Sequence, residues 1–417
     1  MPERGNQLSR RQFLEFVGAS ALGAGALLSA KELSRQPWFP QLSDVSLDVN
    51  NQDLLNTIRT FRVETPRTVL PHGLNGLYFN SPFIYNEGNP EEGAENHAWK
   101  DVVVKAKKYN GNRFRTFIST SFEPRFRQYN MQVLENIANF SNSIENYSDD
   151  AQEPAGLAIC LLDSFPMGNC MLPNAIYGSS RTYSPYNRSG TWDEYERFFT
   201  DEVRFDYYRR RVETIVKTLK NNSTHISSWV PMNEPLPLHI FRTGKKRIPE
   251  AESVGILTDW YKKAVDCIRN NDAETPIVSG VANPWFINEE ELDIDANSCH
   301  AYPFGTDFDR LSQYVKNPER KKPIDFEEVA YPLSIWNVKI PGNVADTLYA
   351  NFVESLFVAT SSIDYDHNTI VPEMTSFGVW HLSATHKDGF GFDDSLQKTT
   401  KLLQMLNNRV FMPFNIR

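Results

Sequence analysis

The 417-residue chain lacks several features that mark other classes of protein. It has only four cysteines, which form no Cys-x-x-Cys pair and no metal-ligand spacing; Cys160 and Cys299 fall in strand-like runs, where buried thiols are expected. No glycine-rich phosphate loop follows the first strand-like run, which argues against a nucleotide-binding fold. No long run of Lys and Arg is present, although nucleic-acid binding needs clustered positive charge. We therefore expect no nucleic-acid partner, no metal and no cofactor.

The first 31 residues differ in charge from the rest of the chain. They carry a net charge of +2, whereas the remainder carries −11. Arg10 and Arg11 precede a Gly- and Ala-rich apolar run at residues 16–28, which is too short to span a bilayer as an ordinary helix. This arrangement resembles the twin-arginine export signal of bacteria, and an amphipathic N-terminal helix is the alternative.

The resemblance to an export signal divides the chain into three parts: the signal at residues 1–31, an N-terminal segment at 32–72 and a folded body at 73–417. We expect export through the twin-arginine route to the periplasm or the cell exterior. The signal lacks a clean Ala-x-Ala cleavage site, so an uncleaved signal that anchors the protein to the membrane is the alternative. No other stretch is long and apolar enough to span a membrane.

Beyond residue 73, short apolar runs alternate with longer amphipathic ones, a pattern typical of βα units and a parallel sheet. Apolar residues spaced by three and four between residues 205 and 219 predict the clearest helix. Eight strand candidates favour a closed (β/α)8 barrel, the TIM barrel, over an open sheet. They are residues 76–80, 114–120, 157–162, 226–232, 276–281, 297–302, 369–373 and 410–414.

Two of these candidate strands end in a glutamate. Asn233-Glu234-Pro235 ends the fourth, and proline biases the residue before it away from helix and stops the strand. Glu373 ends the seventh. Barrel enzymes place their active sites at the C-terminal strand ends, and glycoside cleavage needs one carboxylic acid to protonate the leaving oxygen and one carboxylate to attack or to activate water. Glu234 and Glu373 are therefore the candidate catalytic pair.

Other features also point to the C-terminal face of the expected barrel. His300 and Tyr302 lie two residues apart on the sixth strand, so their side chains share one face and can point together into the site. A core histidine beside a half-buried tyrosine is the alternative. Residues 163–200 and 303–345 are long segments after strands three and six, and we expect them to wall a cleft, with surface decoration as the alternative.

With these residues, the stretch from 195 to 378 resembles the large clan of retaining glycoside hydrolases that includes cellulases and β-mannanases. In that clan an Asn-Glu pair ends strand four, a His-x-Tyr lies on strand six and a Glu ends strand seven. The resemblance implies that Glu234 is the acid/base, that Glu373 is the nucleophile and that Asn233 bonds the 2-hydroxyl of the substrate. It also implies that Tyr302 holds the nucleophile ionised and that His300 lies beside the pair.

The same resemblance implies further substrate-binding residues. Arg115, near the second strand, matches the arginine that steadies the nucleophile. Trp285 follows the fifth strand, Trp380 follows the seventh and Trp192 lies in the long loop after the third strand; each could stack on a sugar face, with ordinary packing as the alternative. We expect hydrolysis of a β-linked, mannan- or cellulose-like oligo- or polysaccharide by double displacement.

The resemblance weakens toward the C-terminal end. The clan often places a tryptophan at the end of strand eight, but no Trp follows Trp380, and the eighth strand candidate leaves no room for an eighth helix before Arg417. We expect an unusually closed barrel, a truncated one, or strands miscounted by one. An incomplete barrel would favour a non-catalytic glycan-binding protein. A metal-dependent barrel hydrolase is a third alternative, disfavoured because clustered His and Asp ligands are lacking.

Overall fold

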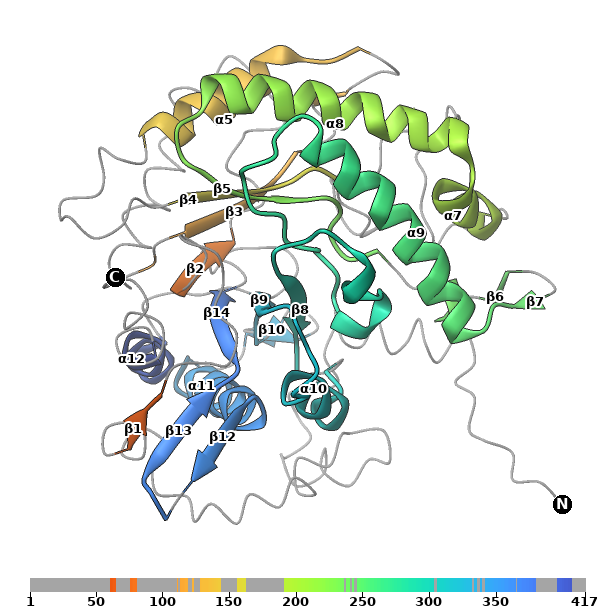
Figure 1. The fold of residues 1–417 in the computed structure, drawn as a ribbon. Coiled ribbons are helices and arrows are strands. Elements are labelled where there is room, and N and C mark those ends of the chain that lie inside the picture. Colours follow the sequence, from red (N-terminus) through yellow and green to blue (C-terminus); the bar gives the residue numbers. More distant parts are fainter. Residues whose placement is uncertain are drawn as a thin grey trace, which may run out of the picture.

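The structure is a computed structural model, shown in Figure 1. The expected export signal at residues 1–31 lies outside its described residues, so that signal and the domain boundaries stay predictions. The described residues are 61–64, 76–80, 111, 113–118, 122–123, 128–143, 156–162, 191–235, 238–240, 242–243, 246–303, 306–331, 334–335, 338–339, 342–364, 366–379 and 396–406.

Parallel strands form the centre of the fold. One sheet of seven strands has the order β5-β4-β3-β2-β14-β9-β8, and each neighbouring pair is parallel. Because the strands are parallel, all their C-terminal ends lie at the same edge. Their bounds are β2 Gly76–Asn80, β3 Arg113–Phe117, β4 Gly156–Cys160, β5 Ile226–Val230, β8 Asn297–Ala301, β9 Ile324–Val329 and β14 Met374–Val379.

An eighth parallel segment, residues 276–279, joins the two outer strands of this sheet. Ile277 forms a parallel bridge with Trp229 of β5, and Val278 forms one with Ala296, the residue before β8. Val278 N donates to Trp229 O at 2.9 Å, and Ala296 N donates to Ile277 O at 3.3 Å. The parallel segments therefore run in a ring, and the predicted (β/α)8 barrel is confirmed.

The first six strand predictions are confirmed, the fifth as the bridging segment, but the seventh is wrong. Thr369–Pro372 is β13, which lies in a separate three-stranded sheet between β1 (Arg62–Val63) and β12 (Ser361–Asp364). The seventh barrel strand is β9. It lies inside the segment 303–345, which the sequence suggests is an insertion after the sixth strand. The eighth is β14, and the candidate at residues 410–414 lies outside the described residues.

Charged residues conceal strand β9 in the sequence. It reads Ile-Asp-Phe-Glu-Glu-Val, and all six residues are buried. Strands covered on both faces usually read as apolar runs. Here Asp325 is buried because Arg113 of β3 binds it at 2.6 Å and the hydroxyl of Ser376 on β14 donates to it. An apolar-run criterion therefore misses this strand, since its charges are neutralised by residues far away in the sequence.

Helices cover the outside of the barrel (Figure 1). The long α8 buries the face that the sequence predicts, including Phe205, Val212 and Ile215, and Asp201 caps its first turn by accepting from Val203 N. A helix, α12, follows β14, so the expectation that no helix follows the eighth strand is wrong. The helices are α5 Met131–Ser143, α7 Thr191–Thr200, α8 Glu202–Asn222, α9 Glu250–Arg269, α10 Phe308–Val315, α11 Gly342–Ala359 and α12 Gln397–Leu406.

Short elements fill the connections. Between the fifth barrel segment and β8 the described chain makes two 3-10 turns, η4 and η5, in place of an α-helix. A 3-10 turn and a small hairpin follow the fourth strand, and another hairpin follows the seventh. These elements are η3 Leu238–Ile240, β6 Arg242–Thr243, β7 Lys246–Arg247, η4 Pro284–Phe286, η5 Glu289–Glu291, β10 Ser334–Ile335 and β11 Val338–Lys339.

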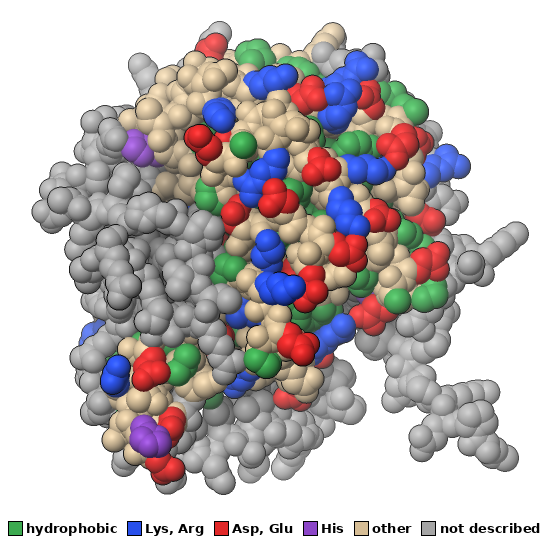
Figure 2. Space-filling view, viewed as in Figure 1, with side chains coloured by type: hydrophobic (Ala, Val, Ile, Leu, Met, Phe, Trp, Pro, Cys, Tyr) green, Lys and Arg blue, Asp and Glu red, His purple; other side chains and the backbone are tan. Residues whose placement is uncertain are grey.

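The described surface mixes charges of both signs (Figure 2). On α8, for example, Arg209 bridges Asp206 at 2.5 Å and Glu213 at 2.6 Å. Three cysteines are buried free thiols, as the sequence suggests for two of them: Cys160, Cys267 and Cys299. Within the described part of the chain, no helix has the length and apolarity to cross a membrane.

Candidate active site

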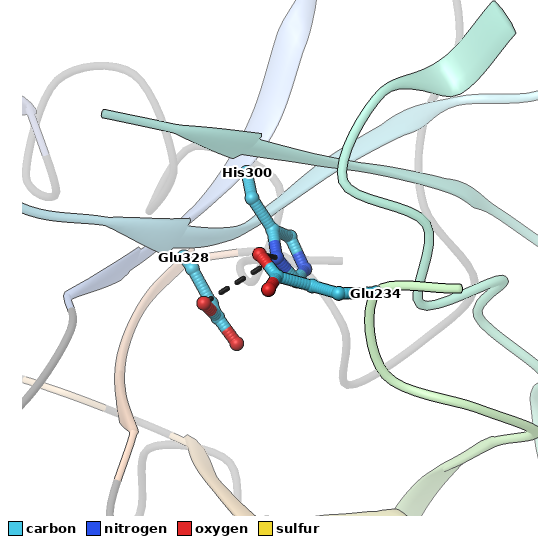
Figure 3. Close-up of side chains that lie close together, drawn as sticks. All are labelled: Glu234, His300 and Glu328. Carbon is cyan, nitrogen blue, oxygen red and sulfur yellow. Dashed lines mark hydrogen bonds and ion pairs between the residues drawn. The ribbon is translucent and has the colours of Figure 1, made fainter. Parts of the chain in front are cut away.

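The site lies at the C-terminal ends of the barrel strands, where Glu234, His300 and Glu328 converge (Figure 3). Glu234 follows β5, His300 is the fourth residue of β8 and Glu328 is the fifth residue of β9. Because these strands are parallel members of one ring, residues near their C-terminal ends meet at one mouth of the barrel.

Glu234 is held by its backbone. Its φ of 45° lies in the left-handed region, which is rare outside glycine, and its N–H donates to the carbonyl of Gly280 at 2.8 Å. Just upstream, the hydroxyl of Tyr208 on α8 donates to Pro231 O at 2.9 Å, and that of Tyr261 on α9 donates to Met232 O at 3.4 Å. Three neighbouring elements thus fix the turn that presents Glu234.

Glu328 lies among hydrogen-bond donors. The hydroxyl of Tyr302 donates to one of its oxygens at 2.5 Å, and Arg115 on β3 donates to the other at 2.6 Å. A second guanidinium nitrogen of Arg115 donates to the amide oxygen of Asn233 at 2.7 Å. The structure therefore brings together four of the residues that the sequence predicts as substrate-binding, namely Asn233, His300, Tyr302 and Arg115, beside Glu234.

A β-bulge directs two consecutive glutamates into the site. Cys299 pairs with Phe326 and His300 with Glu328, so Glu327 is the extra residue on β9. Adjacent side chains of a regular strand point to opposite faces, but a bulge re-aims one of them. Glu327 and Glu328 consequently both contact Arg115 and His300.

His300 is surrounded by carboxylates. Its Nδ1 lies 2.6 Å from Glu234 and 3.3 Å from Glu328, and its Nε2 lies 3.6 Å from Glu327. Burial lowers the pKa of His300, but the charges of Glu328, Glu234 and Glu327 outweigh it and raise the pKa to about 10. The ring is therefore an imidazolium at neutral pH.

The two glutamates of β9 differ in pKa. Burial raises the pKa of Glu327, but Arg115 and His300 bring it below its usual value. Burial and the charge of Glu234 raise the pKa of Glu328, against the opposing effects of His300, Arg115 and Tyr302. The guanidinium of Arg115 and the phenol of Tyr302 limit this rise, because both donate hydrogen bonds to the ionised form of Glu328.

The two carboxylates lie close together in space. One oxygen of Glu234, one oxygen of Glu328 and one ring nitrogen of His300 all lie within 4.8 Å of one another. Carboxyl groups about 5–5.5 Å apart are typical of retaining glycosidases, whereas inverting enzymes keep about 6.5–9.5 Å for a water molecule. The arrangement can protonate an atom on one side and attack on the other.

The same three groups are close enough to offer ligands to one cation, but their surroundings fit a metal poorly. Arg115 already places a cation 2.6 Å from Glu328. A histidine ligand must be neutral, whereas the pKa of His300 is raised to about 10. The cluster is thus better suited to proton transfer and nucleophilic chemistry.

Glu373 does not lie in this site. It precedes β14, whose first residue, Met374, pairs with Ile324, the first residue of β9. Glu373 is therefore at the N-terminal end of the barrel, opposite Glu234. There it is 1% exposed and lies 3.7 Å from Arg320. The expected pair of Glu234 and Glu373 is corrected, because the strand that ends at Pro372 belongs to the small sheet and not to the barrel.

Of the three predicted tryptophans, the structure describes the side chain of Trp285 alone. Trp285 lies in η4, in the outer layer, where the Arg310 guanidinium of α10 covers its ring at 4.6 Å. The ring also packs against Tyr314, with the ring centroids 6.3 Å apart. Trp192 belongs to α7, and Trp380 lies outside the described residues. Trp380 follows β14 directly, so the sequence does place a tryptophan after the eighth strand.

Glu327 and Glu328 are the site residues that sequence reasoning misses. Both lie in the middle of the segment 303–345, which the sequence suggests is an insertion, so they are not recognised as acids at the end of a barrel strand. The signal that could find them is the alternation of Ile324 and Phe326 with charged residues just after Lys322-Pro323. A buried strand rich in acids is best recognised through its partners, Arg113 and Arg115, which the sequence shows on β3.

Comparisons with known proteins agree with the barrel. No family model matches the sequence, and no curated protein matches it. The endo-1,4-beta-mannanase from Rhizomucor miehei has a TM-score of 0.55 and 14% identity, over 84% of this chain and 98% of that chain. A glycoside hydrolase family 5 mannosidase from the same organism has a TM-score of 0.54 and 13% identity, over 80% and 94%. Endo-glycoceramidase II from Rhodococcus sp. has a TM-score of 0.50 and 16% identity, over 80% and 78%. This chain is similar to these hydrolases in fold.

Proposed function

We propose that the protein is a retaining glycoside hydrolase that cleaves the O-glycosidic bonds of a β-linked glycan by double displacement. The main support is one pair of carboxylates in unequal surroundings. Oxygens of Glu234 and Glu328 lie within 4.8 Å of each other, Glu328 is 2% exposed and bound by donors, and Glu234 is 14% exposed at the barrel mouth. This is the combination that a nucleophile and an acid/base need.

Glu328 is the nucleophile in this proposal, in place of Glu373. The resemblance places a glutamate at the end of strand seven, and strand seven is β9. The roles expected for Tyr302 and Arg115 transfer to Glu328, which both of them contact. Their hydrogen bonds favour the carboxylate over the acid, which keeps an electron pair available for attack.

The reaction has two steps. Glu234 gives a proton to the glycosidic oxygen while Glu328 attacks the anomeric carbon, so the bond to the leaving group breaks as the glycosyl-enzyme bond forms. Glu234 then takes a proton from water, and the water oxygen displaces Glu328. The product keeps the anomeric configuration of the substrate. Acid/base assistance of this kind contributes about 10²–10⁴ in rate.

Asn233 and Arg115 orient the sugar in this proposal. Arg115 donates to the amide oxygen of Asn233 at 2.7 Å, and the amide nitrogen of Asn233 is a donor suited to a substrate hydroxyl. Because Asn233 directly precedes Glu234, its amide lies beside the bond to be cleaved. We infer that it binds the 2-hydroxyl, where a hydrogen bond can strengthen in the transition state.

Mannan- or cellulose-like glycans are the substrates to test first. The similar solved structures include an endo-1,4-beta-mannanase and a mannosidase. We expect purified protein to release reducing sugar from at least one of β-mannan, cellulose, xylan and aryl β-glycosides, and a chelator to leave the rate unchanged. Glu234→Ala should slow glycosides with poor leaving groups most, because good ones need little acid assistance. Glycan binding without release would identify a non-catalytic barrel, and loss of activity with chelator would indicate a metal enzyme.

A further inference from the structure

Glu327 is a buried carboxylate beside the proposed nucleophile to which the reaction above gives no role. It is 1% exposed. Its Oε1 lies 3.1 Å from Nε of Arg115, and its Oε2 lies 3.6 Å from Nε2 of His300. A carboxylate buried this deeply costs several kcal/mol unless cations compensate it, and here two cations do. Because the bulge on β9 brings Glu327 to both of them, its position is built into the strand.

The neighbours of the two ring nitrogens of His300 indicate the role of Glu327. The Nδ1 side meets Glu234 and Glu328, and the Nε2 side meets Glu327. A neutral imidazole has one donor and one acceptor nitrogen, so it would turn a lone pair toward a carboxylate on one side. Only the doubly protonated ring offers a proton to both sides. The placement of Glu327 opposite Nε2 therefore favours the imidazolium.

The net charge of the cluster also favours the protonated form of His300. Glu234, Glu327 and Glu328 are three anions, and Arg115 and His300 are two cations, so the fully ionised cluster carries one net negative charge. One additional proton makes it neutral. Glu234 needs that proton to act as the acid. Without the charge of Glu327, the fully ionised cluster would already be neutral.

We propose that Glu327 is a positioning residue for the glycosidase reaction, and that its negative charge keeps His300 doubly protonated beside Glu234. This inference rests on the proposed function. Glu327 touches no reacting atom and acts through Arg115 and His300. Glu327 also holds the guanidinium of Arg115, which donates a hydrogen bond to Glu328.

The remaining charged and titratable neighbours do not replace Glu327. Tyr302, on β8, is neutral as a phenol and donates to Glu328. Arg113, on β3, is neutralised by Asp325 at 2.6 Å on the first half of β9. Both groups stay in place when Glu327 changes, so a shift in pH dependence can be assigned to Glu327.

The test is the pH profile of Glu327→Gln, which keeps the shape of the side chain and removes its charge. Removal of an anion lowers the pKa of every neighbour, so both limbs of the kcat/KM profile should move to lower pH, by about one pH unit. Glu327→Asp keeps the charge and should restore the position of the profile. Glu289→Gln is the matched control, because Glu289 is a buried carboxylate of the outer layer that binds Tyr314 and Asn297. It should leave the profile where it is.

A second measurement needs no catalysis. Protein labelled with ¹⁵N-histidine, with the His300 signal assigned through His300→Gln, reports the protonation of the ring. We expect His300 to stay doubly protonated at pH 8 in the parent protein and to lose a proton at lower pH in Glu327→Gln. An unmoved profile and an unmoved His300 titration in folded Glu327→Gln would overturn the inference and leave the proposed function intact. Failure of every glycan to react would overturn the function, while the titration would still decide the role of Glu327.

Discussion

His300 is the residue on which the charges of the site converge. Its ring is buried between Glu234 on one side and Glu327 on the other. A surface histidine titrates near neutral pH and can act as a switch, but a histidine held between carboxylates cannot. His300 is thus a fixed cation in the working range of most hydrolases. In the proposed reaction, proton transfer and attack therefore fall to Glu234 and Glu328.

This charge state has a consequence for stability. The pKa of His300 is about 10 in the folded protein, whereas a histidine free of neighbours, as in the unfolded chain, has a pKa of 6.5. The folded form therefore binds more protons between these pH values, and its stabilisation is fully present below pH 6.5 and is lost as pH rises through 10. We expect the free energy of unfolding to fall with pH in this window by up to ~1.4 kcal/mol per pH unit more in the parent protein than in His300→Gln. Urea unfolding at several pH values measures it, and parallel slopes would contradict it.

At the scale of elements, the turn after β5 depends on a close approach of two backbones. Gly280 has a φ of +79°, and a Cβ there would lie 2.1 Å from Met232 O and 2.4 Å from Val230 Cγ1. The carbonyl of the same glycine accepts the N–H of Glu234. The fifth barrel segment can therefore hold the turn that carries Glu234 only if residue 280 has no side chain.

We expect Gly280→Ala to destabilise the fold by about 1–3 kcal/mol and to lower kcat more than it raises KM, because the strained turn would displace Glu234. Gly255→Ala is the matched control: Gly255 lies within α9, and a Cβ there meets no atom within 4 Å. That change should be neutral or stabilise the protein by up to about 1 kcal/mol. Thermal unfolding and steady-state kinetics of both variants provide the test. Equal effects of the two substitutions would show that residue 280 tolerates a side chain.

The elements also show how far the sequence alone can lead. The helix α8 and the strand β5 are predictable, because apolar residues at helical spacing and a run that ends in Asn-Glu-Pro are local signals. Strand β9 is not, since Asp325, Glu327 and Glu328 are buried only by partners on other strands. The local pattern instead favours Thr369–Pro372, which pairs within a small sheet.

That one misplaced strand explains the error in the site. With the sheet order known, the next strand after β9 is β14, and Glu373 falls at the wrong end of it. Four other predicted residues do lie beside Glu234, because their positions depend on strands that the sequence shows directly: Asn233, His300, Tyr302 and Arg115. The partner of Glu234 needs the long-range pairing of β9 with β8 and β14, which no local pattern contains.

At the scale of the whole molecule, the barrel brings residues from four strands to one mouth. Arg115 comes from β3, Asn233 and Glu234 follow β5, His300 belongs to β8, and Glu328 lies on β9. The ring runs through the bridging segment at residues 276–279, and β14 joins β9 to β2. The eight parallel segments therefore form a complete ring, in contrast to the incomplete barrel that the sequence suggested as an alternative. This removes the reason for favouring a non-catalytic protein.

The most direct test of the central claim is to trap the covalent intermediate. A 2-deoxy-2-fluoro glycoside with an activated leaving group, built on the sugar that the protein hydrolyses, should label one carboxylate, because fluorine slows the second step more than the first. Peptide mass spectrometry should find the label on Glu328. Glu328→Gln should abolish both the label and turnover, by about 10³-fold or more. Glu373→Gln should retain both, with only a loss of stability. A label on Glu373, or a product of inverted configuration and no label, would contradict the account.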